Sequence, residues 1–600
     1  MTIQKYAVNQ YSVQALLTWV QTGAIAIPEI QRPFVWSATQ VRDLIDSLYT
    51  GYPVGYLIAW KNPHVRLKDG SISEGKRILI DGQQRVTALM SALLGMSVIN
   101  KDYRKVNITI AFNPIEQRFE VTNPAIRKDK QWLPNITDVL SPDVKMLRLV
   151  KEYCEQNEGT DQDEIYESIE LLRGIVNNHI GLIELDSDLD IEAVTEIFIR
   201  INSKGTVLSQ ADFVMSKIAA NDVYGGNLLR KCIDYFCHLA IAPEFYEQIK
   251  ESDTEFANTD YFSKMSWLRK ENDDLYDPPS YTDMLRVAFM SEFQRAKLGD
   301  LVALLSGGRN FETREYEETI AEQSFRTLEK GIMRFMNETD FKRFLMIIRS
   351  AGFIETSMIR SRNALNVAYT LYLTMRNQNE CANDIESCVR RWFVMSLLTG
   401  HYSGSAESTM NFDIKQINEC GAKAYLRDLE EAELSDAFWD AGLPQAMNTS
   451  VATSPYFYAY LAAQVHANDK GFLSKDITVH DLITHRGDIH HLFPRSYLKK
   501  HDLTKGKYNQ IANYVMMQSE INIAVGDQAP KDYFTQILEQ CVAGQAAYGG
   551  ITSLNEMKAN FAAHCIPEGI ETMDVSDYED FLYMRRRLIA DKIRHYYQNI

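Results

Sequence analysis

The chain has 600 residues, with 45% hydrophobic and 24% charged side chains and a formal net charge of −17. The length favours roughly two to four domains, because single cores rarely grow beyond about 300 residues, and the composition argues against a disordered chain. No apolar run reaches bilayer length and no basic start precedes an apolar core, so we expect a cytoplasmic protein without membrane contact. The eight cysteines form no CxxC pair, which argues against a zinc knuckle.

A first domain is predicted over residues 1–215, where short strands alternate with helices in an α/β or α+β pattern. The periodicity predicts strands over 25–27, 54–59, 77–80 and 106–112, and helices over 38–49 and 85–94. The polar, acidic segment 155–164 is expected to be a surface loop.

The segment Asp81-Gly-Gln-Gln-Arg85 follows one of these strands and opens a helix. A strand, a Gly turn and a helix start favour phosphate binding, because free N–H groups and the positive end of the helix dipole face the anion. Arg85 is expected to add a charge-assisted contact, and Asp81 to hold a metal or orient water. Gln83 and Gln84 are expected to position water or a base.

Two further polar segments belong to this domain. The first, Gln31-Arg-Pro-Phe-Val-Trp36, is interpreted as a rigid loop whose aromatic residues pack into the core, an interpretation that suits Arg32 less well. In the second, Phe198-Ile-Arg-Ile-Asn-Ser-Lys-Gly205, Arg200 and Asn202 suit an anion or base edges. A well-capped helix start is an equally weighted interpretation of the second segment.

Residues 216–445 are predominantly helical, with amphipathic helices expected over 316–335 and 364–375. We interpret this part as a helical spacer. Residues 445–454 are the predicted linker, and a C-terminal domain follows over 455–600.

The segment Asp488-Ile-His-His-Leu-Phe-Pro494 places adjacent histidines where extended backbone leads into a Pro-initiated helix. Asn513 and Asn522 follow, and a His pair with two Asn at this spacing is suited to a one-metal nuclease site. The pattern therefore predicts phosphodiester cleavage. Adjacent histidines with a capping or core role are the structural alternative.

A net charge of −17 opposes binding of a polyanion, but a local basic surface can still bind DNA on an acidic protein. The C-terminal domain supplies the candidates Arg495, Lys499, Lys500, Lys505, Lys507, Arg585, Arg586, Arg587, Lys592 and Arg594. A solvated face is the alternative interpretation of these residues.

The three N-terminal motifs together resemble the ParB-like N-terminal domain of GmrSD-type restriction proteins. The His-His-Leu-Phe-Pro segment and its two Asn segments resemble the HNH nuclease domain at the C-terminus of the same proteins. The resemblance covers both ends of the chain, and the helical middle only in general character. It implies an N-terminal domain that binds and hydrolyses nucleoside triphosphates through Asp81, Gln83, Gln84 and Arg85, with Arg32 as an outer contact.

For the C-terminal domain the resemblance implies that His491 is the general base and His490 a metal ligand, with Asp488 as the rival ligand. Asn513 is the central Asn that bonds backbone, and Asn522 is the last ligand or a phosphate contact. The N and O donors favour Mg²⁺ or Mn²⁺, with Zn²⁺ or Ni²⁺ as alternatives.

The sequence thus predicts a multidomain α+β protein with a ParB-like domain, a mainly helical middle and a ββα-metal (HNH) domain. The predicted function is an anti-phage, modification-dependent DNA endonuclease that senses nucleotide or modified DNA; homo-oligomer formation stays open. One alternative is a nucleotide-responsive DNA-binding module with an inactive HNH domain. Another is a toxin-like nuclease acting on host nucleic acid.

Overall fold

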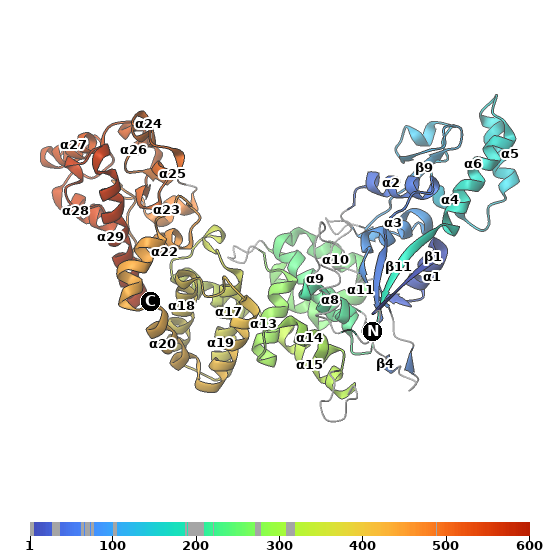
Figure 1. The fold of residues 1–600 in the computed structure, drawn as a ribbon, viewed down its shortest axis with the longest axis horizontal. Helices are drawn as coiled ribbons and strands as arrows, with labels where there is room; N and C mark the ends of the chain where they lie inside the picture. Colours follow the sequence, from blue (N-terminus) through green and yellow to red (C-terminus); the bar gives the residue numbers. More distant parts are fainter. Residues whose placement is uncertain are drawn as a thin grey trace. The chain divides into compact units, whose positions relative to one another are not determined.

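The computed structural model describes residues 5–26, 36–61, 65–66, 72–73, 77–99, 105–186, 189, 209–219, 221, 223–270, 278–307, 318–485, 487 and 489–600 (Figure 1). The chain divides into two compact units, which are described separately below. The first comprises residues 1–263 and 298–329, and the second comprises residues 264–297 and 330–600. The described residues form many helices and small sheets, which agrees with the predicted multidomain α+β class. No helix among them is both long and apolar enough to cross a membrane.

A five-stranded mixed sheet forms the centre of the first unit, in the order β1–β11–β3–β6–β2. Strand β11 pairs antiparallel with β1 and parallel with β3, so strands from the two ends of the domain lie side by side (Figure 1). The strand bounds are β1 Tyr6–Ser12, β2 Ile25–Ala26, β3 Leu57–Lys61, β6 Arg77–Asp81 and β11 His179–Leu185. The predicted strands over 25–27, 54–59 and 77–80 correspond to β2, β3 and β6.

The remaining elements of the first unit are short pairs of strands and helices. The strands are β4 Val65–Arg66, β5 Ile72–Ser73, β7 Val98–Ile99, β8 Lys105–Val106, β9 Ile110–Asn113 and β10 Arg118–Val121. The helices are α1 Val13–Gln21, α2 Ala38–Tyr49, α3 Gln83–Leu94, α4 Ile136–Leu140, α5 Met146–Gln156, α6 Gln162–Gly174, α8 Gln210–Ala219, α9 Gly226–Ile241, α10 Tyr246–Ser252, α11 Thr254–Ala257, α12 Asp260–Lys264 and α14 Leu298–Leu305.

Three details of this unit differ from the sequence prediction. Helix α2 has the predicted bounds, but α3 begins two residues earlier than predicted, directly after Gly82. The strand predicted over 106–112 is divided into β8 and β9. The acidic loop is shorter than predicted, because the Asp161 side chain accepts backbone hydrogen bonds from Asp163 and Glu164 and so caps α6.

Helices make up most of the second unit. Their bounds are α13 Tyr281–Phe293, α15 Glu318–Phe335, α16 Glu338–Ser350, α17 Arg362–Asn377, α18 Ala382–Thr399, α19 Ala406–Cys420, α20 Ala422–Glu433, α21 Leu443–Ala446, α22 Pro455–His466, α23 Val479–Thr484, α24 Arg495–Lys500, α25 Lys505–Tyr508, α26 Ser519–Val525, α27 Pro530–Ala543, α28 Leu554–Ala563 and α29 Tyr578–Asn599, of which α15 begins in the first unit. The helices predicted over 316–335 and 364–375 are confirmed as α15 and α17, the latter extended at both ends. Strands β12 Ile489–His491 and β13 Tyr514–Met516 form the small sheet of this unit.

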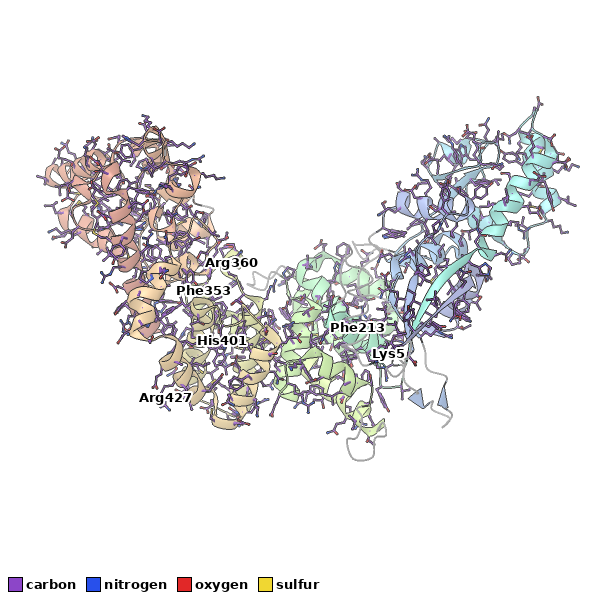
Figure 2. All side chains as sticks on the ribbon, in the orientation of Figure 1. Lys5, Phe213, Phe353, Arg360, His401 and Arg427 are labelled. Atoms are coloured by element: carbon purple, nitrogen blue, oxygen red, sulfur yellow. The ribbon has the colours of Figure 1, made fainter. Side chains whose placement is uncertain are left out.

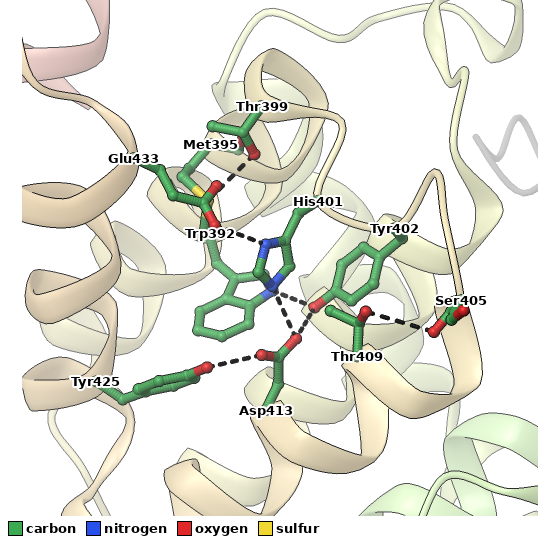
Figure 3. Close-up of polar contacts among 10 residues, drawn as sticks. All are labelled: Trp392, Met395, Thr399, His401, Tyr402, Ser405, Thr409, Asp413, Tyr425 and Glu433. Carbon is green, nitrogen blue, oxygen red and sulfur yellow. Dashed lines mark hydrogen bonds and ion pairs between the residues drawn. The ribbon is translucent and has the colours of Figure 1, made fainter. Parts of the chain in front are cut away.

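A buried polar network joins α18, α19 and α20. His401 belongs to this network (Figure 2). Its imidazole lies between Asp413 and Glu433, with Nε2 at 3.0 Å from the Asp413 carboxylate and Nδ1 at 3.2 Å from that of Glu433 (Figure 3). Tyr402 and Tyr425 each donate a hydrogen bond of 2.8 Å to Asp413. Burial lowers the pKa of His401, but the two carboxylates outweigh this effect and raise it to about 9.

Residues 445–454, the predicted linker, lie within the second unit. The Thr449 carbonyl accepts a hydrogen bond from the Ile511 amide, and the Ser450 carbonyl accepts one from the Tyr514 hydroxyl. The segment is therefore held against the chain that leads into β13. The limits of the three domains expected from the sequence stay predictions.

Candidate functional site

The adjacent histidines lie on β12, which pairs antiparallel with β13 so that His490 faces Val515 and His491 faces Tyr514 in register. His490 is buried and His491 is half-buried. Helix α26 follows β13 and carries Asn522, which is also half-buried. Two short antiparallel strands followed by a helix are thus the local frame of the predicted nuclease residues.

Asn513 is fully buried at the start of β13 and bonds backbone on two segments. Its Oδ1 accepts a 2.8 Å hydrogen bond from the Phe493 amide, and its Nδ2 donates to the carbonyls of Phe493 (3.1 Å) and Tyr508 (3.2 Å). A buried amide whose donors and acceptor are all satisfied rigidifies what it joins. Asn513 therefore fixes the loop that follows the histidines, which is the structural part of its predicted role.

Among the described residues, His491 makes one side-chain hydrogen bond. Its Nε2 lies 3.0 Å from Oδ1 of Asn509, at the end of α25. Burial is the largest cause that lowers the pKa of His491 below its ordinary value, and electrostatic interactions with Arg495 and His490 lower it further, against the effect of the hydrogen bond to Asn509. A lowered pKa keeps the imidazole neutral near pH 7, as a general base must be.

Two basic side chains of α24 lie near the ring of Tyr508, whose centroid lies 6.4 Å from that of His491. The Arg495 guanidinium and the Lys499 ammonium lie 5.6 and 5.8 Å from the Tyr508 ring centroid. Lys505 and Lys507 are exposed on α25. We call Arg495, Lys499, Lys505 and Lys507 the basic surface; the ring contact places its first two members near His491.

Three basic residues of α29 have partners within the protein. Arg585 is fully buried and donates hydrogen bonds to the carbonyls of Ala512, Tyr514 and His564. Lys592 pairs with Asp469 at 2.7 Å, and Arg594 pairs with Asp436. The sequence interpretation of Arg585 as a DNA contact is therefore wrong, because this side chain is buried and supports the strand β13. Lys592 and Arg594 already pair with carboxylates, and their contact with DNA stays a prediction.

The candidate metal ligands are only partly within the described residues. His490 and Asn522 supply one imidazole and one amide oxygen, and Asp488 lies outside the described residues. Within the described part of the chain, no three His, Cys, Asp or Glu side chains form a metal-binding group. The donor types present suit an ion that keeps several water ligands, as Mg²⁺ does.

The N-terminal motif also has a defined geometry. Asp81 ends β6, Gly82 has a left-handed backbone with φ of 93°, and α3 begins at Gln83. Arg85 donates to the Asp81 carboxylate at 3.1 Å and to the Val54 carbonyl at 2.9 Å. Arg85 therefore orients Asp81 and ties the start of α3 to the chain before β3.

Gln83 and Gln84 occupy the first turn of α3, where the Gln83 amide donates to the Leu79 carbonyl at 3.2 Å. This side chain bonds back to its own strand, whereas the sequence interpretation gave it a role with water or a base. The other predicted contacts, Arg32, Arg200 and Asn202, lie outside the described residues. The nucleotide-binding role of the motif stays a prediction.

The sequence interpretation missed Asn509 and Tyr508. Both belong to the segment Lys-Gly-Lys-Tyr-Asn, whose pattern indicates only a positive charge. The separation of 18 residues between His491 and Asn509 carries no periodic signal.

Residues 13–219 match a family model described as the GmrSD restriction endonuclease, N-terminal domain. This match supports a GmrSD-like restriction protein, and it includes the Asp81–Arg85 motif. The chain is also similar to an uncharacterized protein of Methanocaldococcus jannaschii, with 20% identity over 95% of this chain and 96% of the relative. The similarity to that relative therefore extends through the helical part and the histidine hairpin.

Proposed function

We propose that this protein is a phage-defence DNA endonuclease in which the β12–β13–α26 segment is an HNH-type nuclease site. The match of residues 13–219 to the N-terminal domain of a restriction endonuclease supports the defence role. The hydrogen bond of His491 to Asn509, beside a loop fixed by Asn513, is the observation that carries the nuclease assignment. The basic surface beside Tyr508 supports a polyanionic substrate.

In the proposed reaction, His491 accepts the proton of the water that attacks the phosphodiester. The water oxygen bonds to phosphorus, the bond between phosphorus and one sugar oxygen breaks, and that leaving oxygen takes a proton from solvent. Burial and electrostatic interactions with Arg495 and His490 lower the pKa of His491, so the neutral form is present at physiological pH. Arg495 and Lys499 bind phosphates and hold the strand against the hairpin. His490 and Asn522, with Asp488 as the alternative ligand, would hold Mg²⁺ or Mn²⁺, which would supply charge stabilisation at the phosphate.

The N-terminal domain is the proposed sensor. It binds or hydrolyses a nucleoside triphosphate through the Asp81–Arg85 motif, or it recognises modified DNA. The turn at Gly82 supports the first role, because it leads directly into α3, whose first amides face outward along the helix axis. Asp81, oriented by Arg85, is then a candidate for orienting water or a metal ion.

The test combines three DNA substrates with the purified full chain: plasmid, unmodified phage DNA and hypermodified phage DNA. Each is incubated with Mg²⁺ or Mn²⁺, with and without nucleoside triphosphate, next to the His491→Ala variant. We expect cleavage that the variant loses by at least about 100-fold, because general-base catalysis typically contributes that much. Arg85→Ala tests the sensor, and should change nucleotide dependence while leaving His491 chemistry intact.

Two outcomes would redirect the assignment. Binding of DNA without cleavage under any condition favours the nucleotide-responsive DNA-binding module with an inactive HNH domain. Toxicity on expression that needs His491 but no phage favours the toxin-like nuclease.

A further inference from the structure

We propose that Asn509 is a positioning residue for the nuclease reaction. Asn509 holds the neutral His491 with its proton on Nε2, so that Nδ1 of His491 accepts the proton of the attacking water. The inference rests on the proposed function, in which His491 is the general base. The inference adds Asn509 to that site and names Nδ1 of His491 as the atom that accepts the proton.

The contact itself carries the assignment. Oδ1 of Asn509 lies 3.0 Å from Nε2 of His491. An amide oxygen can only accept a hydrogen bond, so a neutral imidazole that bonds to it must carry its hydrogen on Nε2. Among the described residues no hydrogen bond is found to Nδ1, which is therefore the nitrogen left with a lone pair.

Asn509 is itself held in place by the same framework that holds the histidine loop. Asn509 ends α25, and its backbone N–H donates to the Lys505 carbonyl at 3.2 Å. The preceding residue, Tyr508, is buried, and its carbonyl accepts hydrogen bonds from Asn513 Nδ2 at 3.2 Å and from the Tyr578 hydroxyl at 3.3 Å. Asn513 thus connects Phe493, two residues after His491, with Tyr508, one residue before Asn509.

A neutral amide suits this position better than a carboxylate. A carboxylate at this distance would stabilise the imidazolium and raise the pKa of His491, so less of the free base would be present near pH 7. An amide oxygen orients the ring with a smaller effect on its charge.

The test compares Asn509→Ala and Asn509→Asp in the full chain, on the DNA that the wild-type protein cuts. Gln510→Ala is the matched control, because Gln510 is the neighbouring carboxamide and donates to the Gly506 carbonyl at 2.8 Å without contacting His491. We expect Asn509→Ala to lower kcat about tenfold or more with little change in KM, as loss of an outer partner of a catalytic group does. Asn509→Asp should move the acidic limb of the rate–pH profile upward by about one unit or more. Gln510→Ala should change neither kcat nor the rate–pH profile.

A second measurement does not depend on cleavage. Histidine-selective ¹⁵N NMR reports which ring nitrogen of His491 carries the hydrogen, with the signal assigned by its absence in His491→Ala. We expect an Nε2–H form in the wild-type protein and a mixed population in Asn509→Ala. Unfolding midpoints of all variants identify any that fail to fold.

The outcomes separate this inference from the proposed function. If His491→Ala is inactive while Asn509→Ala keeps the wild-type rate and pH profile, Asn509 has no positioning role and the nuclease assignment stands. If His491→Ala cuts like the wild type, the nuclease assignment fails, and the NMR result alone decides the state of His491. An Nδ1–H form in the wild-type protein overturns the inference in either case.

Discussion

Asn513 and His491 sit on the same hairpin, but their side chains have different surroundings. Asn513 is fully buried with three backbone hydrogen bonds, whereas His491 is half-buried with one side-chain bond. We therefore expect Asn513→Ala to lower the free energy of unfolding by about 2–4 kcal/mol, because it leaves buried backbone groups unsatisfied. His491→Ala should cost about 1 kcal/mol or less while abolishing cleavage. Urea unfolding of both variants tests this, and equal midpoints for Asn513→Ala and the wild type would show that the loop does not depend on Asn513.

His401 leads to a prediction about pH. Its pKa of about 9 in the folded protein exceeds the ordinary value of 6.5, because Asp413 and Glu433 outweigh the effect of burial. The charged His401 imidazole therefore stabilises the folded state fully below pH 6.5, and this stabilisation is lost as the pH rises through about 9. Since one pKa unit corresponds to about 1.4 kcal/mol, this contribution is on the order of 3 kcal/mol.

The measurement is the unfolding free energy of the wild type and His401→Gln at pH 6 and pH 9.5. The difference between the two proteins should be large at pH 6 and should shrink at pH 9.5. His595→Gln, a change at an exposed histidine of α29, is the control. A difference that stays constant with pH would mean that the imidazole is not charged in the folded protein.

At the scale of single elements, the junction of β6 and α3 depends on Gly82. Its φ is 93°, and a Cβ at this position would lie 2.2 Å from Leu57 Cδ2. Gly82→Ala should therefore destabilise the first unit by about 2–4 kcal/mol, through left-handed backbone strain and the clash. Gly174→Ala, at the end of α6 with no atom near its Cβ, should be neutral or stabilising by up to about 1 kcal/mol. Equal unfolding midpoints for the two variants would contradict this geometry of the turn.

Helix α25 gives a prediction for DNA binding. Lys505 and Lys507 are exposed beside Tyr508. If they contact phosphates, each change to Glu should weaken DNA binding and reduce the slope of log K against log salt by about one unit. Lys558→Glu on α28 makes the same charge change and should have little effect. Equal slopes in all three variants would remove α25 from the DNA-binding surface.

Local patterns predicted many of these elements, and long-range contacts explain what they missed. The helix over Ala38–Tyr49 and the strand before Asp81 follow from apolar spacing, caps and glycine, which act over a few residues. The contact of His491 with Asn509 and the burial of Arg585 depend on segments brought together by folding. Charge alone suggested that Arg585 is exposed, whereas four hydrogen bonds to backbone carbonyls offset its burial.

At the scale of the whole molecule, each compact unit is built from two separate stretches of the chain. In the second unit, α13 contributes Asp283, which accepts a 2.7 Å hydrogen bond from Asn366 on α17. The terminal helix α29 bonds to the same helical part: the Tyr596 hydroxyl donates to the Ala351 carbonyl, and the Tyr597 hydroxyl donates to Glu430 at 2.5 Å. The histidine hairpin thus shares one unit with residues 264–297 and 330–445 of the predicted helical spacer, whereas residues 216–263 and 298–329 of that spacer belong to the first unit.

The contacts of α29 with the helical part predict how stable fragments of the chain are. Residues 455–600 contain every proposed nuclease residue but lose the partners of Tyr596 and Tyr597, whose hydroxyls would no longer be satisfied in the same way. We expect this fragment to unfold at a markedly lower urea concentration than residues 264–600, which keep those partners. Circular dichroism during urea unfolding measures both. Equal midpoints would mean that 455–600 is an independent domain as the sequence predicts, and that the hydrogen bonds of α29 to the helical part contribute little to its stability.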